Sequence, residues 1–230
     1  MKLLAIDTST EACSAALFIN GEISERYEIA PRKHAELILP MIGELLADAG
    51  CSLPEMDAIA FGRGPGAFTG VRIGTGVVQG LAFSIDRPVV PVSSLAAMAY
   101  GAMAAYKVDN VFAGIDARMG EVYWGVYQRD ADDGVQLLDD ESVCKPDETF
   151  IPASGNWIGV GTAWQAYRDA LTARYDRLLS EAYSDLFPRA KDIAALGVIG
   201  FEAGNVVSAD EAQPVYLRND VAKKKKASSA

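Results

Sequence analysis

Several features that mark metalloenzymes, secreted proteins and membrane proteins are missing from this sequence. A single histidine, His34, occurs among the 230 residues, so no paired-histidine metal motif can form. The three cysteines are widely spaced without a CxxC pair, which favours reduced thiols and a cytoplasmic location. No apolar run reaches about 18 residues, and the first one ends at Asp7, so neither a membrane span nor a signal peptide is expected.

The sequence also lacks a nucleophile motif and a surplus of positive charge. No serine lies in a GxSxG motif, so hydrolase chemistry is not expected, and no catalytic residue or metal ligand is predicted. The net charge is −10, and four of the 21 basic residues form the run Lys223–Lys226. So acidic a body binds nucleic acid poorly, because phosphate contacts dominate such affinity. RNA would be contacted only indirectly. The tail at 219–230 is predicted to be mobile and solvated, and the sequence leaves open whether its lysines touch RNA.

The most distinctive stretch is the glycine-rich segment Gly62–Gly74. It follows a predicted strand at 58–61 and opens a predicted helix at 70–84. A strand, a glycine turn and a helix N-terminus form the usual frame for holding an anion. The candidate anion-loop residues are Gly64, Pro65, Gly66, Thr69 and Gly70, with Thr69 as the expected N-cap. A tight turn that binds nothing explains the pattern equally well, because the segment matches neither standard phosphate loop.

The predicted helix at 70–84 contains four glycines, each of which costs roughly 1 kcal/mol relative to alanine. Very close approach of another backbone is the usual compensation. Gly76, Gly80 and Ser84 form one flat strip at helical spacing. Two interpretations follow: a buried central helix of one domain, or a helix with one side packed on another protein chain.

The order of predicted elements in the first half is typical of one superfamily. Strands are predicted at 2–7, 12–19 and 22–29, then a helix at 34–49, the strand at 58–61, the helix at 70–84 and a strand at 89–92. This order, β-β-β-α-β-α-β, is the half-module of the actin, sugar-kinase and Hsp70 superfamily. The first phosphate hairpin of that superfamily corresponds to Asp7, Thr8 and Ser9. No glycine occurs between Asp7 and Gly21, so a turn without strong nucleotide contact is favoured over a phosphate site.

The second half predicts another hairpin followed by αβ elements. Ser93 or Ser94 caps a helix through about Tyr106, and strands are expected at 111–116, 121–128, 136–143 and 157–161. A helix begins near 163, another covers 192–201, and 215–218 is a short extended piece. We expect an α/β actin-like fold of two lobes, 1–92 and a degenerate 93–218, followed by the tail at 219–230.

Three further positions in the sequence leave alternatives open. Gly159 and Gly161 of a GxGT segment are either an adenosine-side loop or a plain strand-to-helix turn. Arg72 lies in the first turn of the glycine helix, where the dipole disfavours a cation. It needs a neighbouring carboxylate of the same chain, a partner chain or a bound anion. His34 is expected to cap a helix or meet a partner rather than bind a metal.

Six segments together resemble the bacterial TsaB (YeaZ) family. They are LLAIDTST at 3–10, KHAELILPMI at 33–42, GRGPGAFTGVRIG at 62–74, PVSSLAAMA at 91–99, GIDARMGEVYWGVY at 114–127 and PVYLRNDVA at 214–222. The resemblance covers essentially the whole chain and is strongest over 1–127, with Gly159–Thr162 a looser match.

The resemblance implies a non-catalytic member of the actin-like superfamily that forms a heterodimer with a catalytic paralogue, TsaD. TsaD would hold the metal and transfer a threonylcarbamoyl group to the tRNA adenosine beside the anticodon, position 37, and the ATPase TsaE would complete the assembly. ATP or ADP would bind only in the complex. The helices at 34–49 and 70–84 would dock TsaD, or a second copy in a homodimer. The implied interface residues are His34, Leu37, Met41, Leu45, Arg72, Ile73, Gly76, Val77 and Gly80.

Two other functions are compatible with the same residues. A small-molecule kinase or ATPase of this superfamily is suggested by the two candidate phosphate turns, and a regulator that homodimerises without the paralogue is the third hypothesis. The sequence leaves open the oligomeric state of the isolated chain and whether nucleotide binds at the heterodimer seam.

Overall fold

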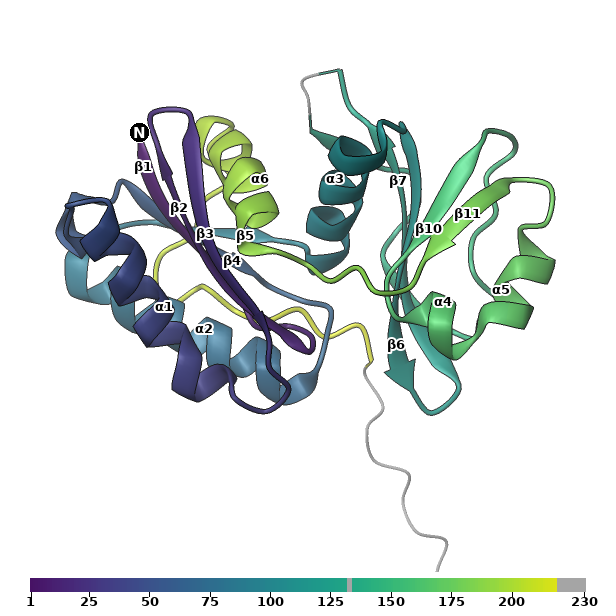
Figure 1. The fold of residues 1–230 in the computed structure, drawn as a ribbon, viewed down its shortest axis with the longest axis horizontal. Helices are drawn as coiled ribbons and strands as arrows, with labels where there is room; N and C mark the ends of the chain where they lie inside the picture. Colours follow the sequence, from purple (N-terminus) through teal and green to yellow (C-terminus); the bar gives the residue numbers. More distant parts are fainter. Residues whose placement is uncertain (132–133, 219–230) are drawn as a thin grey trace, which may run out of the picture.

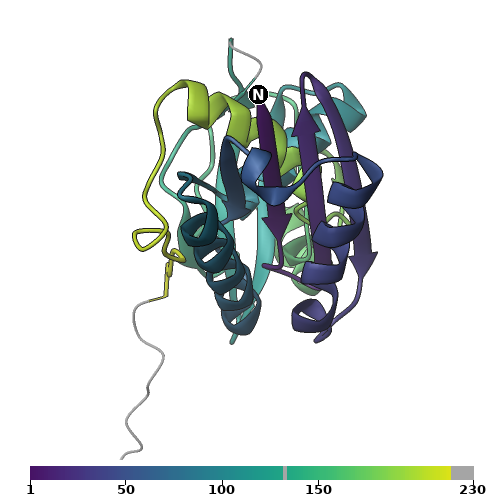
Figure 2. The ribbon, with the colours of Figure 1, turned by 90° about the vertical axis from the view of Figure 1, so that its left-hand side faces the viewer.

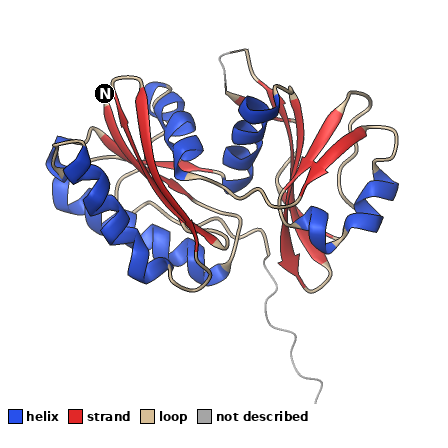
Figure 3. Ribbon diagram, viewed as in Figure 1, coloured by secondary structure: helices blue, strands red, loops and turns tan. Residues whose placement is uncertain are grey.

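The first lobe is a five-stranded mixed sheet with two helices on its outer face. The computed structural model describes residues 1–131 and 134–218, and Figures 1 and 3 show the two lobes side by side. The strands are β1 (Lys2–Asp7), β2 (Ala12–Ile19), β3 (Glu22–Ile29), β4 (Ala58–Gly62) and β5 (Val89–Val92), in the order β3-β2-β1-β4-β5. The first three are antiparallel, whereas β4 and β5 run parallel to β1. This is the predicted β-β-β-α-β-α-β order.

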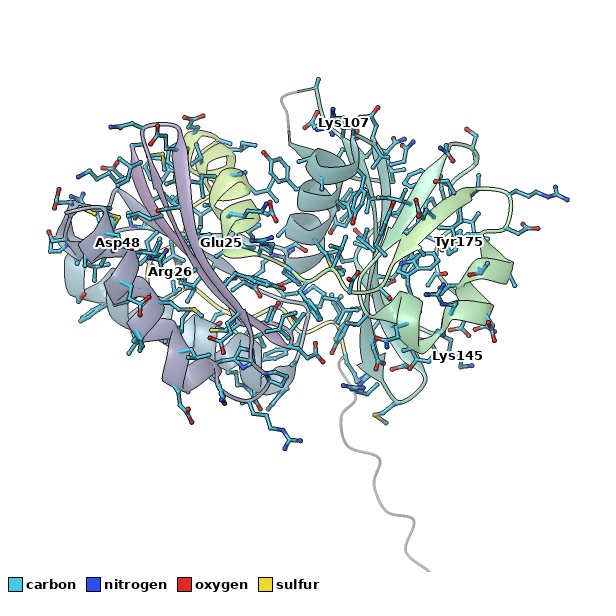
Figure 4. The ribbon with its side chains drawn as sticks, viewed as in Figure 1. Glu25, Arg26, Asp48, Lys107, Lys145 and Tyr175 are labelled. Carbon is cyan, nitrogen blue, oxygen red and sulfur yellow. The ribbon has the colours of Figure 1, made fainter. Side chains whose placement is uncertain are left out.

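Helices α1 (His34–Asp48) and α2 (Phe68–Ile85) cover the outer face of this sheet, which Figure 2 views directly. The buried stripe of α1 consists of Ile38, Ile42 and Leu45, and it packs with strand residues such as Leu4 in one apolar core. A short 3₁₀ turn, η1 (Leu53–Glu55), precedes β4. Arg26 of β3 forms ion pairs with Glu44 and Asp48 of α1, so the edge strand and the helix are also joined at the surface (Figure 4).

The second lobe repeats the strand order of the first. Its strands are β6 (Asn110–Arg118), β7 (Glu121–Arg129), β8 (Val135–Leu137), β9 (Ser142–Cys144), β10 (Trp157–Val160) and β11 (Leu179–Tyr183). They are ordered β8-β7-β6-β10-β11, with β9 also pairing with β7. Two short strands, β8 and β9, therefore stand where β3 stands in the first lobe, and the described residues 145–156 between β9 and β10 form no helix equivalent to α1. These two losses are what makes the second lobe degenerate, as predicted.

Large aromatic side chains fill the core of the second lobe beneath its short helices α4 (Ala163–Ala166) and α5 (Arg168–Arg174). One buried cluster contains the rings of Phe112, Trp124, Trp157, Trp164 and Tyr175. Within it, the ring centroids of Phe112 and Tyr175 lie 4.2 Å apart. Figure 4 labels Tyr175 in this position. Each aromatic side chain buries roughly 150–250 Å², so a few of them are enough to fill a small hydrophobic core.

The two lobes exchange a helix. Helix α3 (Ser94–Tyr106) follows β5 of the first sheet but packs on the second, where Leu95 and Met98 meet Val111. Helix α6 (Ala190–Glu202) follows β11 but packs on the first sheet, where Ile193 meets Leu3. The chain then stays with the first lobe as far as Ala212, which lies in the core beneath α1 and α2. The predicted second lobe at 93–218 is therefore corrected, because 190–212 belongs to the first lobe.

One local prediction is also corrected, and one is confirmed. Thr69 is not the N-cap of α2: the helix begins at Phe68, its N-cap is Ala67, and no side chain caps it. The predicted short piece at 215–218 forms neither a helix nor a strand, and its Val215 N–H donates to the Arg63 carbonyl over 2.8 Å. Ser93 caps α3 as predicted, its Oγ accepting from the amides of Leu95 and Ala96. The tail with Lys223–Lys226 lies outside the described residues.

The turn between β1 and β2, residues 8–11, packs directly against the glycine segment. The Ala67 N–H donates to the Ser9 carbonyl over 2.7 Å, and Thr8 Oγ1 donates to the Gly70 carbonyl over 2.8 Å. A Cβ on Gly66 would lie 2.2 Å from the Ser9 carbonyl oxygen, and one on Gly70 would lie 2.1 Å from that of Thr8. The close backbone approach expected for a glycine-rich helix is therefore made within this chain.

One buried carboxyl group lies where the exchanged helices meet. Asp192, in the first turn of α6, is 7 % exposed, and a Cβ on Gly101 of α3 would lie 2.5 Å from its Oδ2. Burial raises the pKa of Asp192 from 3.8 to about 7, and the negative charge of Glu25 acts in the same direction. The positive charges of Lys191 and Arg189 lower the pKa but are outweighed. The protonated carboxyl group is therefore the form that this contact favours.

We predict that Gly66→Ala and Gly70→Ala each destabilise the protein by about 3 kcal/mol or more, because backbone atoms cannot make room for the new methyl group. Gly76→Ala, on the same helix, is the matched control: no atom lies within 4 Å of its Cβ position. It should stabilise the protein by about 1 kcal/mol through helix propensity. Urea unfolding followed by circular dichroism measures all three. Equal effects at positions 70 and 76 would contradict the close contact.

We also predict a pH-dependent gain in stability for Asp192→Asn. The folded-state pKa of about 7 exceeds the ordinary 3.8, so wild-type stability falls as the pH rises from about 4 through 7. The neutral asparagine avoids this loss, which amounts to at most about 4 kcal/mol for a shift of this size. The gap between variant and wild type in the free energy of unfolding should widen between pH 4 and pH 8. A gap that stays constant over this range would show that Asp192 ionises normally in the folded protein.

Candidate functional site

A hollow of about 590 Å³ lies between the lobes, beside the turn at residues 8–11. The first lobe contributes this turn and the start of α2, and the second contributes the end of β6, Tyr123 of β7, and α4 with the preceding Thr162. Its polar lining includes Ser9, Thr10, Thr162, Gln165, Asp116, Arg118 and Arg218. Asp116 is already engaged, because its carboxylate accepts from Arg118 and from the Tyr167 hydroxyl.

Of the residues predicted for the first phosphate hairpin, only Ser9 faces this hollow. Asp7 is 1 % exposed and accepts from the Ser9 amide over 2.9 Å and from the hydroxyls of Ser9 and Ser94. A Cβ on Gly62 would lie 1.8 Å from Asp7 Oδ2. Burial raises the pKa of Asp7 to about 6 in spite of these hydrogen bonds. Asp7 and Thr8 hold the turn to the body of the lobe.

The glycines of the two candidate loops have packing roles. The Gly64 carbonyl accepts from the Ser94 amide over 3.0 Å. A Cβ on Gly159 would lie 2.2 Å from the Trp164 ring, and one on Gly161, at φ +98°, would lie 2.3 Å from the Gly114 carbonyl oxygen. Thr162, rather than either glycine, lines the hollow. These contacts account for the glycines without a ligand, and an anion at either loop stays a prediction.

A buried carboxylate joins the two lobes away from the lining of the hollow. Glu141, whose side chain is 7 % exposed, lies in the loop before β9 and accepts from the hydroxyls of Ser93 and Tyr127. Arg63, at the start of the glycine segment, approaches the same carboxylate to 3.3 Å. Burial, together with the nearby Glu141 charge, raises the pKa of Tyr127 well above its usual value. No sequence pattern predicts this cluster, because its members are far apart along the chain.

The outer face of α1 and α2 contains most of the predicted interface residues. Arg72, Gly76 and Gly80 are exposed, and Leu37, Ile73 and Val77 are half-buried. Three predicted residues are corrected, because they are buried within the lobe: His34 is 6 % exposed, Met41 8 % and Leu45 1 %. Met41 and Leu45 belong to the core. His34 Nε2 lies 2.8 Å from the Thr10 carbonyl oxygen and 3.2 Å from that of Ala12, so it fixes the start of α1 to the turn.

Two exposed apolar residues of this face were missed. Phe83 is 82 % exposed and Leu39 53 %. Phe83 follows Gly76 by seven residues and Gly80 by three, so helical spacing alone was enough to place it on the glycine strip. Leu39 follows the buried Ile38 directly and therefore points away from the core.

Of the three alternatives for Arg72, a carboxylate of the same chain is not found among the described residues, and the other two stay predictions. The Cζ of Arg72 lies 3.3 Å from the centroid of the Phe68 ring and 5.2 Å from that of Tyr216, and no ion pair to it occurs among the described residues. A guanidinium group over an aromatic face is stabilised by the ring quadrupole. Phe68 precedes Arg72 by one helical turn, but Tyr216 arrives from the far end of the chain, which sequence spacing could not show.

Two searches of the described residues gave no candidate. Residues 1–131 and 134–218 contain no group of three or more His, Cys, Asp or Glu side chains placed to hold a metal ion. Among the same residues, no helix has both the length and the apolar character needed to cross a bilayer.

Comparison with known proteins gives consistent matches along the chain. The family model "TsaD: tRNA N6-adenosine threonylcarbamoyltransferase" matches residues 24–226. The "tRNA threonylcarbamoyladenosine biosynthesis protein TsaB" of Escherichia coli K12 is 45 % identical over 228 residues, covering 98 % of both chains. The protein of the same name from Haemophilus influenzae is 42 % identical, covering 98 % of this chain and 97 % of its own.

A solved structure agrees with these matches. The structure "YeaZ from Pseudomonas aeruginosa" is 46 % identical, covers 94 % of this chain and 99 % of its own, and superposes with a TM-score of 0.88. The two-lobed α/β architecture predicted from the order of elements is confirmed. On this similarity over nearly its full length, the chain belongs to the TsaB (YeaZ) family.

Proposed function

We propose that the chain is a non-catalytic subunit required for threonylcarbamoyl transfer to adenosine 37 of tRNA. It would act as the partner of the catalytic paralogue TsaD. The observation that carries this proposal is 45 % identity, over 98 % of the chain, to a protein named for threonylcarbamoyladenosine biosynthesis. The match of residues 24–226 to the TsaD model supports the pairing, since paralogues share one family model.

The state of the acidic groups near the hollow supports a non-catalytic role. Asp7 is buried beneath the turn, and Asp116 is hydrogen-bonded to Arg118 and Tyr167. Glu11, the remaining carboxylate of the lining, lies 3.8 Å from Arg118. A general base must be free to reach the proton that it removes. We therefore assign the chemistry, and any metal or nucleotide that it needs, to TsaD and to the complex with the ATPase TsaE.

The outer face of α1 and α2 is the proposed docking surface. Exposed apolar area on this face comes from Leu39 and Phe83. Beside them lie the exposed glycines Gly76 and Gly80, whose Cβ positions are open. A partner helix can approach such a strip more closely than one covered by side chains. The same face would join two copies of this chain when TsaD is absent, because a twofold interface uses one surface twice.

We predict that Gly80→Trp and Phe83→Glu each abolish capture of co-expressed TsaD. The first fills the flat strip, and the second places a charge in an apolar interface, where an unpaired charge is costly. Capture by an affinity tag measures the effect, and circular dichroism verifies the fold. Ala170→Trp, on the exposed side of α5, is the matched control and should leave capture unchanged. Normal capture by both α2 variants would exclude this docking surface.

We further predict that threonylcarbamoylation of tRNA, reconstituted with TsaD, TsaE and threonylcarbamoyl-adenylate, falls to background when this chain is omitted. Mass spectrometry of tRNA digests measures the modified nucleoside. A second arm measures binding of ATP and magnesium to the isolated chain by calorimetry and should find millimolar affinity or none. Modification without the chain would reject the proposed function. Tight binding and turnover of ATP by the isolated chain would favour the kinase or ATPase alternative.

A further inference from the structure

A second hollow, of about 610 Å³, adjoins the start of α2 and is lined by aromatic and arginine side chains. We call it the arginine–aromatic pocket, after the side chains of Phe68, Arg72, Tyr123, Tyr216 and Arg218 in its lining. We propose that it binds an unpaired nucleotide of the RNA substrate, with the base on an aromatic face and the phosphate at Arg72. This inference rests on the proposed function and departs from the expectation that RNA is contacted only indirectly.

The aromatic side chains of the pocket are unusually accessible. Phe68 is 56 % exposed and Tyr216 43 %, whereas most large apolar side chains of the protein lie inside it. Their ring centroids are 5.9 Å apart at an interplanar angle of 38°, with the Arg72 guanidinium against the Phe68 face. Exposed rings beside arginine are the platform on which proteins stack unpaired bases, and each stacked base contributes about 1–3 kcal/mol.

The charges around the pocket single out Arg72 as the phosphate ligand. Arg218 is paired with Glu121, and Arg118 is paired with Asp116 over 2.8 Å and with Glu11 over 3.8 Å. Among the described residues Arg72 alone of these three arginines has no carboxylate partner. Its N–H groups are therefore available to a phosphate, the anion whose geometry suits a guanidinium group.

The position of the pocket favours a long polyanion over a small ligand. It shares Gly66, Phe68, Tyr123 and Arg218 with the hollow between the lobes, so the two form one continuous trough. Arg72 precedes Gly76 by one turn of α2, so the trough borders the proposed docking surface. RNA bound to TsaD would therefore pass beside it.

The test measures binding of a fluorescein-labelled, unmodified tRNA transcript by anisotropy, at several salt concentrations, to the chain and to its complex with TsaD. Arg72→Ala should weaken binding about tenfold and reduce the salt slope by about one. Tyr216→Ser should weaken binding about tenfold, whereas Tyr216→Phe keeps the ring and the wild-type affinity. Arg168→Ala, an exposed arginine on α5, is the matched control and should bind as wild type.

Three results would overturn the proposal. The first is wild-type affinity for Arg72→Ala and Tyr216→Ser, or no RNA binding by any form. The second is loss of TsaD capture by these variants, which would assign the pocket to the protein interface. The third is equal displacement of the RNA by AMP, which would make the ligand a free nucleotide. Failure of the proposed function is detected by a different measurement. It would appear as threonylcarbamoylation of tRNA that persists when the chain is omitted.

Discussion

The backbone contact between the β1–β2 turn and the glycine segment is the constraint on which the rest of the first lobe depends. Ser9 accepts from the Ala67 amide, and Thr8 donates to the Gly70 carbonyl, so the start of α2 is fixed to the end of β1. His34 fixes the start of α1 to the other side of the same turn. The turn at residues 8–11 thus positions both outer helices. Their relative placement, and with it the shape of the face between them, follows from this one contact.

The glycines just before α2 and along it divide into two sets. Gly66, Gly70 and Gly74 point inward, where the turn leaves no space for a side chain. Gly76 and Gly80 point outward, and no atom of the described residues lies within 4 Å of their Cβ positions. Packing within the chain is enough to account for the first set. The second set has no packing role in the folded monomer. Because each of these glycines lowers the stability of the helix relative to alanine, their presence suggests a role in contact with another molecule.

Local signals predicted the first lobe well, because each of its strands and helices is encoded within a short stretch of neighbouring residues. Prediction was wrong where contacts join distant parts of the chain. The return of α6 to the first sheet, the aromatic partner Tyr216 of Arg72 and the inward side of His34 all depend on tertiary structure. Helical spacing alone could have identified Phe83 as exposed. It could not have distinguished Met41 and Leu45 from docking residues, since core and interface stripes share one period.

The return of α6 has a consequence for biosynthesis on the ribosome. The inner side of the first sheet, with Leu3, Ala5 and Ala60, is covered by Ile193 and Ala194, and Gly197 allows α6 to lie against Ala60. Strands β1 to β5 are translated about one hundred residues before their cover, a delay of the order of ten seconds at bacterial elongation rates. Until then the nascent sheet presents an apolar surface, so the strands that are translated first complete their packing only after α6 has been made.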